Sequence, residues 1–233
     1  MKNKLFTPYE WFLILGIITS NIIYSVLSKE IDVAGSLAGI TGVLCVVLVA
    51  KGNIWNYVFG LVNVSLYAYI SFKATAYGDA ALNALYYVPM QFIGYYAWKR
   101  RGASISSDAS GHGAEVKARR LSLKQRVLLG LGSAAAILLV AWILDMCGDG
   151  QPLKDSTTTV LSIIAQALMA MAFMEQWVLW ILTNIVSVVM WVLFVIDGKP
   201  HAAVMVIMWS FYLLNSINGL RIWLRLSRGQ DAK

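Results

Sequence analysis

Charged residues are scarce in this sequence. Asp, Glu, Lys and Arg together make up 13% of the 233 residues, whereas 59% are hydrophobic, and the mean hydropathy is +0.66. Soluble globular domains carry about 25% charged residues. A chain this poor in charge cannot cover a folded surface with hydrated side chains, so a soluble domain is excluded.

The uncharged residues form eight blocks without Asp, Glu, Lys or Arg. Each approaches the roughly 20 residues that a helix needs to cross about 30 Å of hydrocarbon. The blocks do not alternate apolar and polar residues as barrel strands do, so we expect an all-α integral membrane protein with about eight transmembrane helices. The first block lacks a small-residue cleavage site and is expected to be a retained helix. The blocks cover residues 11–28, 33–50, 54–72, 80–98, 127–144, 156–174, 176–196 and 202–220.

Carboxylates are absent from the middle of every block. A carboxylate at mid-membrane is the usual group for relaying protons or holding a sodium ion. Its absence argues against transport coupled to an ion gradient. The acidic residues nearest to the blocks lie at block ends or in loops: Glu10, Glu30, Asp32, Asp79, Asp145, Asp149, Asp155, Glu175 and Asp197.

Histidine and cysteine are also rare, and neither occurs in a catalytic or metal-binding pattern. His112 lies in a polar linker and His201 at the start of a block, while Cys45 and Cys147 form no CxxC pair. There is no GxxxxGK[ST] sequence for ATP. We therefore expect no metal, no cofactor and no disulfide framework, and the lack of a nucleophile beside a histidine argues against an enzyme.

Basic residues are distributed unevenly between the two sides that eight helices would define. The side shared by both termini and by the connections after the second, fourth and sixth helices holds 15 of the 19 basic residues. Such an excess marks the cytoplasmic side, and it accounts for the net charge of +7 without nucleic-acid binding. The 15 residues are Lys2, Lys4, Lys51, Lys99, Arg100, Arg101, Lys117, Arg119, Arg120, Lys124, Arg126, Arg221, Arg225, Arg228 and Lys233, whereas Lys29, Lys73, Lys154 and Lys199 lie opposite.

The two halves of the sequence resemble each other. In each half a block begins with Trp, has Asn seven or eight residues later, and is followed by a block that ends in Gly-x-x-x-Trp before an Arg. With the apolar block that precedes each pair, this gives two parallel three-helix repeats about an axis along the membrane normal, joined by a linker helix. The expected organisation is an extra N-terminal helix (1–30), the first repeat (31–99), a basic cytoplasmic linker (100–126), the linker helix with an outer loop (127–155), the second repeat (156–226) and a cytoplasmic tail (227–233).

Amides and aromatic rings recur at helical spacing on the third, fourth, seventh and eighth blocks. Residues three or four apart share one helix face, and an amide at mid-membrane faces the bundle or a cavity. Each amide taken singly fits a helix–helix hydrogen bond as well as a ligand contact. Together the stripes indicate a central binding cavity, with these candidate residues: Trp55, Phe59, Asn63, Tyr87, Gln91, Trp177, Trp180, Asn184, Tyr212 and Asn215.

A cavity of rings and neutral amides suits a planar heterocycle. A positively charged ring gains a cation–π attraction from Trp, Tyr or Phe, and Asn and Gln can both donate and accept hydrogen bonds. Pro89 lies in the middle of the fourth block, where it removes a backbone hydrogen bond and predicts a kink. That kink is either a static bend or a hinge for alternating access.

Three features together resemble a known family. They are the WxxW of Trp177 and Trp180 with Asn184 after it, Gln91 in a tyrosine-rich block, and a last helix with Asn215 that ends in a basic tail. They resemble the PnuC family of bacterial nicotinamide riboside transporters, which is related in fold to the SWEET sugar transporters. The resemblance covers residues 31–226.

The resemblance implies a three-plus-one-plus-three helix bundle in the bacterial inner membrane. It also implies facilitated diffusion of nicotinamide riboside without a coupling ion, trapping of the substrate by a cytoplasmic kinase, and a homotrimer. The residues leave two alternatives open: a SWEET-like transporter of another nucleoside, vitamin or sugar, and an intramembrane enzyme. The enzyme would need a His/Asp pair at mid-membrane, and the sequence has none.

The charge distribution predicts that both termini are cytoplasmic. A phosphatase reporter fused after Lys233 should be inactive, because it needs the periplasm, and a fluorescent reporter at the same place should be active. An active phosphatase fusion would contradict the orientation.

Overall fold

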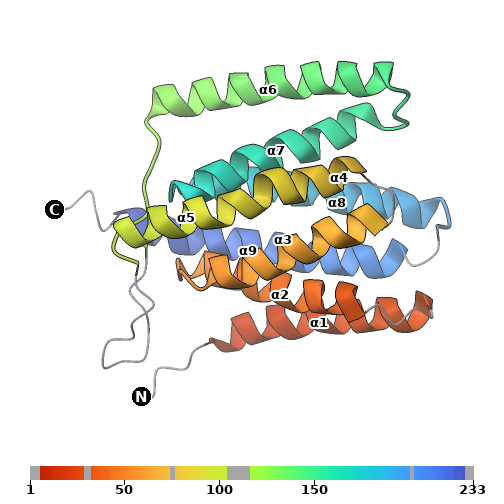
Figure 1. Cartoon of the computed structure of the whole chain (residues 1–233), viewed down its shortest axis with the longest axis horizontal. Helices are drawn as coiled ribbons and strands as arrows, with labels where there is room; N and C mark the ends of the chain where they lie inside the picture. Colours follow the sequence, from red (N-terminus) through yellow and green to blue (C-terminus); the bar gives the residue numbers. More distant parts are fainter. Residues whose placement is uncertain (1–5, 29–32, 74–76, 104–115, 200–201, 229–233) are drawn as a thin grey trace.

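A computed structural model of the chain describes residues 6–28, 33–73, 77–103, 116–199 and 202–228. Within these ranges the chain is helical throughout its regular structure (Figure 1), which confirms the predicted fold class. Several residues used above lie outside the described ranges: Lys2, Lys4, Lys29, Glu30, Asp32, His112, His201 and Lys233.

The described residues form eight helical segments, as the eight blocks predict. One of them, residues 77–100, is continuous but contains three elements. The elements are α1 (Pro8–Ser28), α2 (Val33–Ala50), α3 (Asn56–Lys73), α4 (Tyr77–Ala81), the π-helix η1 (Leu82–Tyr87), α5 (Val88–Arg100), α6 (Leu123–Met146), α7 (Pro152–Ala170), α8 (Gln176–Ile196) and α9 (Ala202–Arg228).

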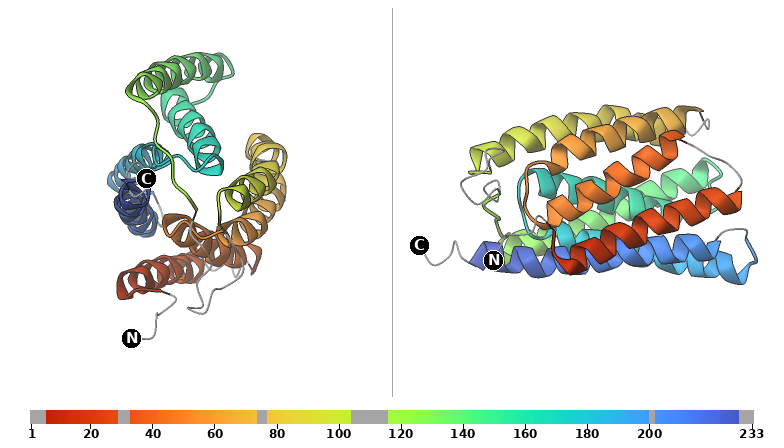
Figure 2. Two further views of the ribbon diagram at one scale, coloured as in Figure 1. Left: turned by 90° about the vertical axis from the view of Figure 1, so that its left-hand side faces the viewer. Right: turned by 90° about the horizontal axis from the view of Figure 1, so that it is seen from below.

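Five of these helices are both long enough and apolar enough to cross a membrane: α1, α2, α6, α8 and α9. The more polar segments α3, α4–η1–α5 and α7 run alongside them in the same bundle (Figures 1 and 2). Several polar residues of these segments are buried among the helices, including Asn56, Gln91 and Gln166, so they are compatible with a place within the bilayer.

Two helices begin several residues before the apolar blocks that predicted them, and the local sequence explains where they begin. The helix α6 begins at Leu123 rather than in the apolar block at residue 127, because Ser122 and Gln125 form a reciprocal capping box. Ser122 Oγ accepts from Gln125 N at 3.3 Å, and Ser122 N donates to Gln125 Oε1 at 2.9 Å. The helix α7 begins at Pro152, because a proline at the first helical position has the backbone angle that a helix needs and no N–H that would be left unpaired.

A π-helical turn, η1, lies directly before Pro89, the residue at which the sequence predicts a kink. Val88 N donates to Asn83 O, a bond across five residues instead of four, and Pro89 follows without an N–H of its own. The wider turn accommodates the proline ring within a continuous helix, and such turns are frequent at functional positions.

Six of the helical segments form a ring. We call α2, α3 and α4–η1–α5 the first unit, and α7, α8 and α9 the second unit. Within each unit consecutive helices pack together, and the units meet where α5 contacts α7 and where α9 contacts α2. The helix α1 packs outside this ring on α2 and α9, and α6 packs outside it on α7 (Figure 2).

The two units have the same turn between their first and second helices. Gly52 and Ala172 occupy the same place in it, and both have positive φ, 66° and 60°. Gly52 N donates to Val49 O and Ala172 N donates to Met169 O, both at 2.9 Å. Ala172 therefore adopts a conformation that normally favours glycine, which indicates that the turn geometry is required in both units.

Both turns lie at the end of the bundle where the described chain also begins and ends (Figure 1). Lys51 in the first turn bonds Glu10 of α1 at 3.1 Å, and Arg120 in the basic linker bonds Ser227 of α9 at 2.7 Å. We call this the basic end. The described basic residues that the sequence assigns to one side therefore do gather at one end of the bundle, although its orientation stays a prediction.

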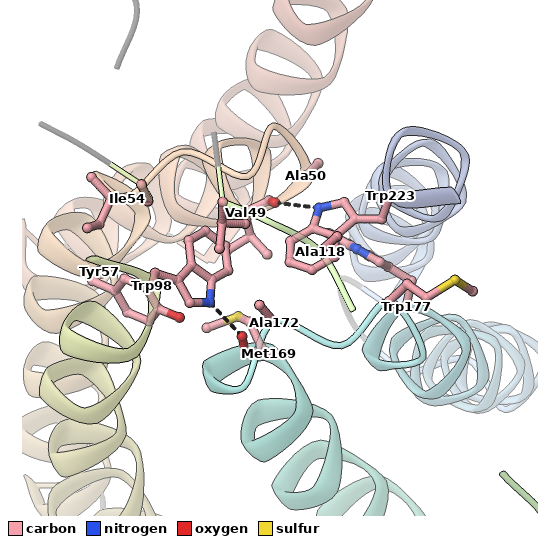
Figure 3. Packing of buried hydrophobic residues seen from close by; sticks show 13 residues of the cluster. Val49, Ala50, Ile54, Tyr57, Trp98, Ala118, Met169, Ala172, Trp177 and Trp223 are labelled. Carbon is pink, nitrogen blue, oxygen red and sulfur yellow. Dashed lines mark hydrogen bonds between the residues drawn. The ribbon is translucent and has the colours of Figure 1, made fainter. Parts of the chain in front are cut away.

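Tryptophans join the two units at the basic end (Figure 3). Trp98 at the end of α5 donates from Nε1 to Met169 O of α7 at 2.8 Å. Trp223 of α9 donates from Nε1 to Val49 O of α2 at 3.0 Å. Each unit thus binds the end of the other unit's first helix through the Trp of its Gly-x-x-x-Trp sequence, and both indoles are fully buried.

Candidate functional site

Gln91 is the amide most clearly available to a ligand. It is 4% exposed, and its Nε2 donates to Tyr87 O of its own helix at 3.2 Å. Its Oε1 accepts no hydrogen bond from a described residue. Gly60 of α3 makes room for it, because a Cβ there would lie 2.5 Å from Oε1 and 3.1 Å from Cys45 Sγ. Gln91 therefore places an unpaired acceptor between α3 and α2.

Two aromatic residues occupy equivalent positions in the two units. Tyr57 at the start of α3 packs its ring against Gly94, and Trp177 at the start of α8 packs its ring against Gly219, where a Cβ would come within 2.5 Å. Both rings are buried. The Tyr57 OH and the Trp177 Nε1 have no hydrogen-bond partner among the described residues, so each ring also presents a polar atom.

Three of the predicted asparagines connect helices. Asn63 Nδ2 donates to Ala38 O at 2.7 Å, which joins α3 to α2. Asn215 Nδ2 donates to Val46 O at 3.2 Å, which joins α9 to α2. Asn184 Nδ2 donates to Ser216 Oγ at 2.8 Å, which joins α8 to α9. Each of these donors already has a structural partner, whereas Asn215 Oδ1 has none among the described residues.

The predicted aromatic residues differ in their burial. Phe59, Tyr87, Trp180 and Tyr212 are half-buried, and Trp180 packs against the apolar cluster that holds Trp177. Trp55, in the turn before α3, is the most exposed of the predicted residues, at 42%. The other predicted residues lie on helices of the six-helix ring, and Trp55 directly precedes one of these helices.

Most buried polar atoms without a partner, among the described residues, belong to the ring helices. Native proteins pair nearly all such atoms, so each unpaired one calls for an explanation. Donors and acceptors both occur, which allows a ligand with both kinds of group. On the ring helices they are Asn56 Oδ1, Tyr57 OH, Gln91 Oε1, Gln166 Nε2, Gln176 Nε2 and Oε1, Trp177 Nε1, Thr183 Oγ1, Trp209 Nε1 and Asn215 Oδ1.

The buried carboxylates lie at the basic end and are paired. Glu10 bonds Lys51 at 3.1 Å, and Glu175 bonds Arg126 at 2.9 Å. Throughout the described ranges, no group of three His, Cys, Asp or Glu residues could hold a metal ion. The candidate site is therefore electrically neutral, and its polarity comes from amides, hydroxyls and indoles.

Two cavities are found on the outer side of the second unit. One of about 560 Å³ lies between α6, α7 and α8 and includes Ser133 and Glu175. The other, of about 390 Å³, lies at the opposite end near Lys154 and Asp197. Neither is lined by a residue predicted to bind substrate, so neither is the candidate site.

Sequence reasoning missed Tyr57, Cys45 and Ser216. It aligned the halves by their first tryptophans, which pairs Trp55 with Trp177. The turns align instead as Gly52 with Ala172, and this register pairs Tyr57 with Trp177. The alanine that ends both α2 and α7, at Ala50 and Ala170, was a signal in the sequence that could have given the register.

Comparisons with known proteins agree with this architecture. The sequence profile of the nicotinamide mononucleotide transporter family matches residues 32–225. The nicotinamide riboside transporter PnuC of Neisseria mucosa is 38% identical over 191 residues, which is 82% of this chain and 72% of that protein. The transporter of the same name from Haemophilus influenzae is 35% identical over 190 residues, 82% of this chain and 78% of that one.

A solved structure is also similar. The crystal structure of the vitamin B3 transporter PnuC matches with a TM-score of 0.75 at 35% identity, over 96% of this chain and 93% of that one. At this similarity the arrangement of the helices is shared along nearly the whole chain.

The bond from Asn184 to Ser216 predicts a specific loss of stability. Replacing Ser216→Ala removes the acceptor and leaves a buried amide unpaired, so the ligand-free protein should lose about 1 kcal/mol of stability. Thermal unfolding in detergent measures it. Ser210→Ala is the matched control, because Ser210 Oγ bonds only Val206 O of its own helix. Equal shifts for the two variants would contradict the role of the Asn184–Ser216 bond.

Proposed function

The chain belongs to the nicotinamide mononucleotide transporter family, and from this membership we propose that it carries nicotinamide riboside across the bacterial inner membrane by facilitated diffusion. The relatives named above are nicotinamide riboside transporters. Nicotinamide riboside contains a positively charged pyridinium ring, a carboxamide and ribose hydroxyls. Rings and neutral amides are the groups that bind these three parts.

The unpaired Gln91 Oε1 is the observation that supports this proposal most directly. A buried acceptor without a partner is costly in the free protein, and a ligand that donates an N–H or O–H offsets that cost. In the proposed complex Gln91 accepts from the carboxamide or a ribose hydroxyl. Trp180 and the neighbouring rings stack on the pyridinium, and Asn184 and Asn215 contribute oxygen atoms while their Nδ2 atoms hold the helices.

Transport without a coupling ion fits the charge of the site. Ion-coupled carriers place carboxylates within the membrane to bind protons or sodium. Here the buried carboxylates Glu10 and Glu175 are paired with Lys51 and Arg126 at the basic end. A neutral site also leaves the cationic substrate free to dissociate, because no opposite charge holds it.

We also propose that the first and second units are the two three-helix repeats of a three-plus-one-plus-three arrangement, with α6 as the linker helix. The matching turns at Gly52 and Ala172 and the reciprocal bonds of Trp98 and Trp223 support this. Alternating access then separates the units at one end at a time, with Pro89 as a hinge. The basic end faces the cytoplasm in this proposal, and a homotrimer stays a prediction from the family resemblance.

The affinity for nicotinamide riboside should depend on Gln91 more strongly than the thermal stability of the ligand-free protein does. Calorimetric titration of Gln91→Ala with nicotinamide riboside should give a Kd about tenfold to a hundredfold higher than wild type, because one buried hydrogen bond is lost. The ligand-free variant loses only the bond from Nε2 to Tyr87 O of the same helix, because Oε1 has no partner among the described residues, so it should melt closer to wild type than a variant that loses a bond between helices. Asn184→Ala should change both quantities.

Gln125→Ala serves as the control for Gln91, because Gln125 caps α6 at the surface and should leave Kd unchanged. Nicotinamide and thiamine, titrated against the wild type, test the ligand class. A folded Gln91→Ala variant with wild-type affinity would remove Gln91 from the site.

Transport should be passive. Because the substrate is a cation, the membrane potential is clamped at zero. Proteoliposomes loaded with buffer should then take up nicotinamide riboside only until inside and outside concentrations are equal, and imposed proton or sodium gradients should not raise that level. The reason is the lack of a carboxylate in the candidate site. Accumulation above the outside concentration under either gradient would refute facilitated diffusion.

A further inference from the structure

The end of the basic linker crosses the basic end of the bundle and contacts both units. We call residues 116–121 the strap. Val116 and Ala118 of the strap are each 2% exposed, and both belong to the buried cluster that contains Trp98, Trp177 and Trp223 (Figure 3). This part of the linker is therefore packed into the fold at the place where the two units join.

The strap is bound to the turn of the second unit through its backbone. Arg119 N donates to Ala172 O at 2.7 Å, and Met174 N donates to Arg119 O at 2.9 Å. The guanidinium of Arg119 lies 4.3 Å from the centre of the Phe173 ring. These contacts form a short parallel bridge with the second turn.

Hydrogen bonds that involve side chains also attach the strap to the second unit. Arg120 Nε donates to Ser227 Oγ at 2.7 Å and Arg120 Nη2 donates to Leu224 O at 3.0 Å, both in α9. Leu121 N donates to the carboxylate of Glu175 at 3.1 Å. Hydrogen bonds that involve a charged group are roughly twice as strong as neutral ones, so these three strengthen the attachment considerably.

The contacts with the first unit are fewer and neutral. Val116 N donates to Gly52 O at 3.0 Å, and Lys117 N donates to Arg101 O at 3.4 Å. Val116 Cγ1 lies 3.3 Å from the position that a Cβ would take on Gly52. Gly52 and Ala172 are equivalent positions of the two turns, so the strap binds the same carbonyl in each unit but holds the second unit far more strongly.

We propose that the strap is a latch: it stays on the second unit and releases the first unit when the basic end opens. Opening breaks the bonds from Val116 to Gly52 and from Lys117 to Arg101, while the bonds of residues 119–121 persist. The proposal rests on the proposed function, because it assumes that the two units separate at this end during transport.

Two disulfide pairs in the full-length protein test the latch. The latch pair, Gly52→Cys with Val116→Cys, joins the strap to the first unit, and the anchor pair, Arg119→Cys with Phe173→Cys, joins it to the second. Cys147→Ser is the background. The native Cys45, whose Sγ lies near Gln91 at the candidate site, reports opening through its rate of modification by the small reagent MTSET in inside-out vesicles, read by peptide mass spectrometry.

Oxidation of the latch pair should slow Cys45 modification and nicotinamide riboside uptake by more than about tenfold, and reduction should restore both, because the opening motion is blocked. Oxidation of the anchor pair should change neither by more than about twofold, since the strap and the second unit move together. The single variant Gly52→Cys measures the effect of a side chain at a positive φ.

Val116→Pro provides an independent test, because it removes the N–H that bonds Gly52 O. Cys45 should react about two- to tenfold faster in this variant, whereas Val116→Ala keeps the N–H and should react at nearly the wild-type rate.

Unimpeded Cys45 modification with the latch pair oxidised would overturn the proposal, and so would an equal block by the anchor pair. Cys45 modification needs no substrate. If the reduced protein takes up no nicotinamide riboside, the proposed substrate is wrong, and the reaction of Cys45 still decides whether the strap is a latch.

Discussion

Closure of the six-helix ring depends on two reciprocal hydrogen bonds at the basic end. The indole N–H of Trp98 bonds the last turn of α7, and the indole N–H of Trp223 bonds the last turn of α2. Each of these carbonyls also accepts the N–H of its own turn, from Gly52 and from Ala172, so the indole from the other unit is a second donor to the same oxygen. The strap binds close to the same junction, because it bonds Gly52 O and Ala172 O, three residues beyond these carbonyls in each unit.

The closed ring also determines which amides can bind a ligand. Asn63, Asn184 and Asn215 donate to groups on neighbouring helices and help to hold the ring together. Gln91 bonds only its own helix, because Gly60 leaves space for its carbonyl oxygen instead of supplying a partner. Whether a buried amide bonds another helix or keeps an unpaired oxygen thus depends on the residue opposite it.

The sequence was sufficient to predict the all-α class, the eight helical segments and the gathering of basic residues at one end. Those features follow from hydropathy and charge along the chain, which need no knowledge of tertiary contacts. Which amides bond other helices could not be predicted, because the partner of Asn184 is Ser216 on the next helix and the partner of Asn215 is Val46, far away in the sequence. Spacing alone also does not show that Trp55 is 42% exposed while Tyr57, two residues later, is buried.

Facilitated diffusion, as proposed above, requires the contacts between the units to break with thermal energy alone. Each indole or backbone bond at the junction contributes about 1 kcal/mol net, so the two indole bonds and the two strap bonds to the first unit together contribute only a few kcal/mol to the junction. Collective hinge motions of helices occur on the microsecond to millisecond scale. The charged bonds of Arg120 and Glu175 would add several kcal/mol if they also crossed between the units. They lie instead within the second unit and its strap, so they add nothing to the bonds between the units, as the proposed uncoupled transport requires.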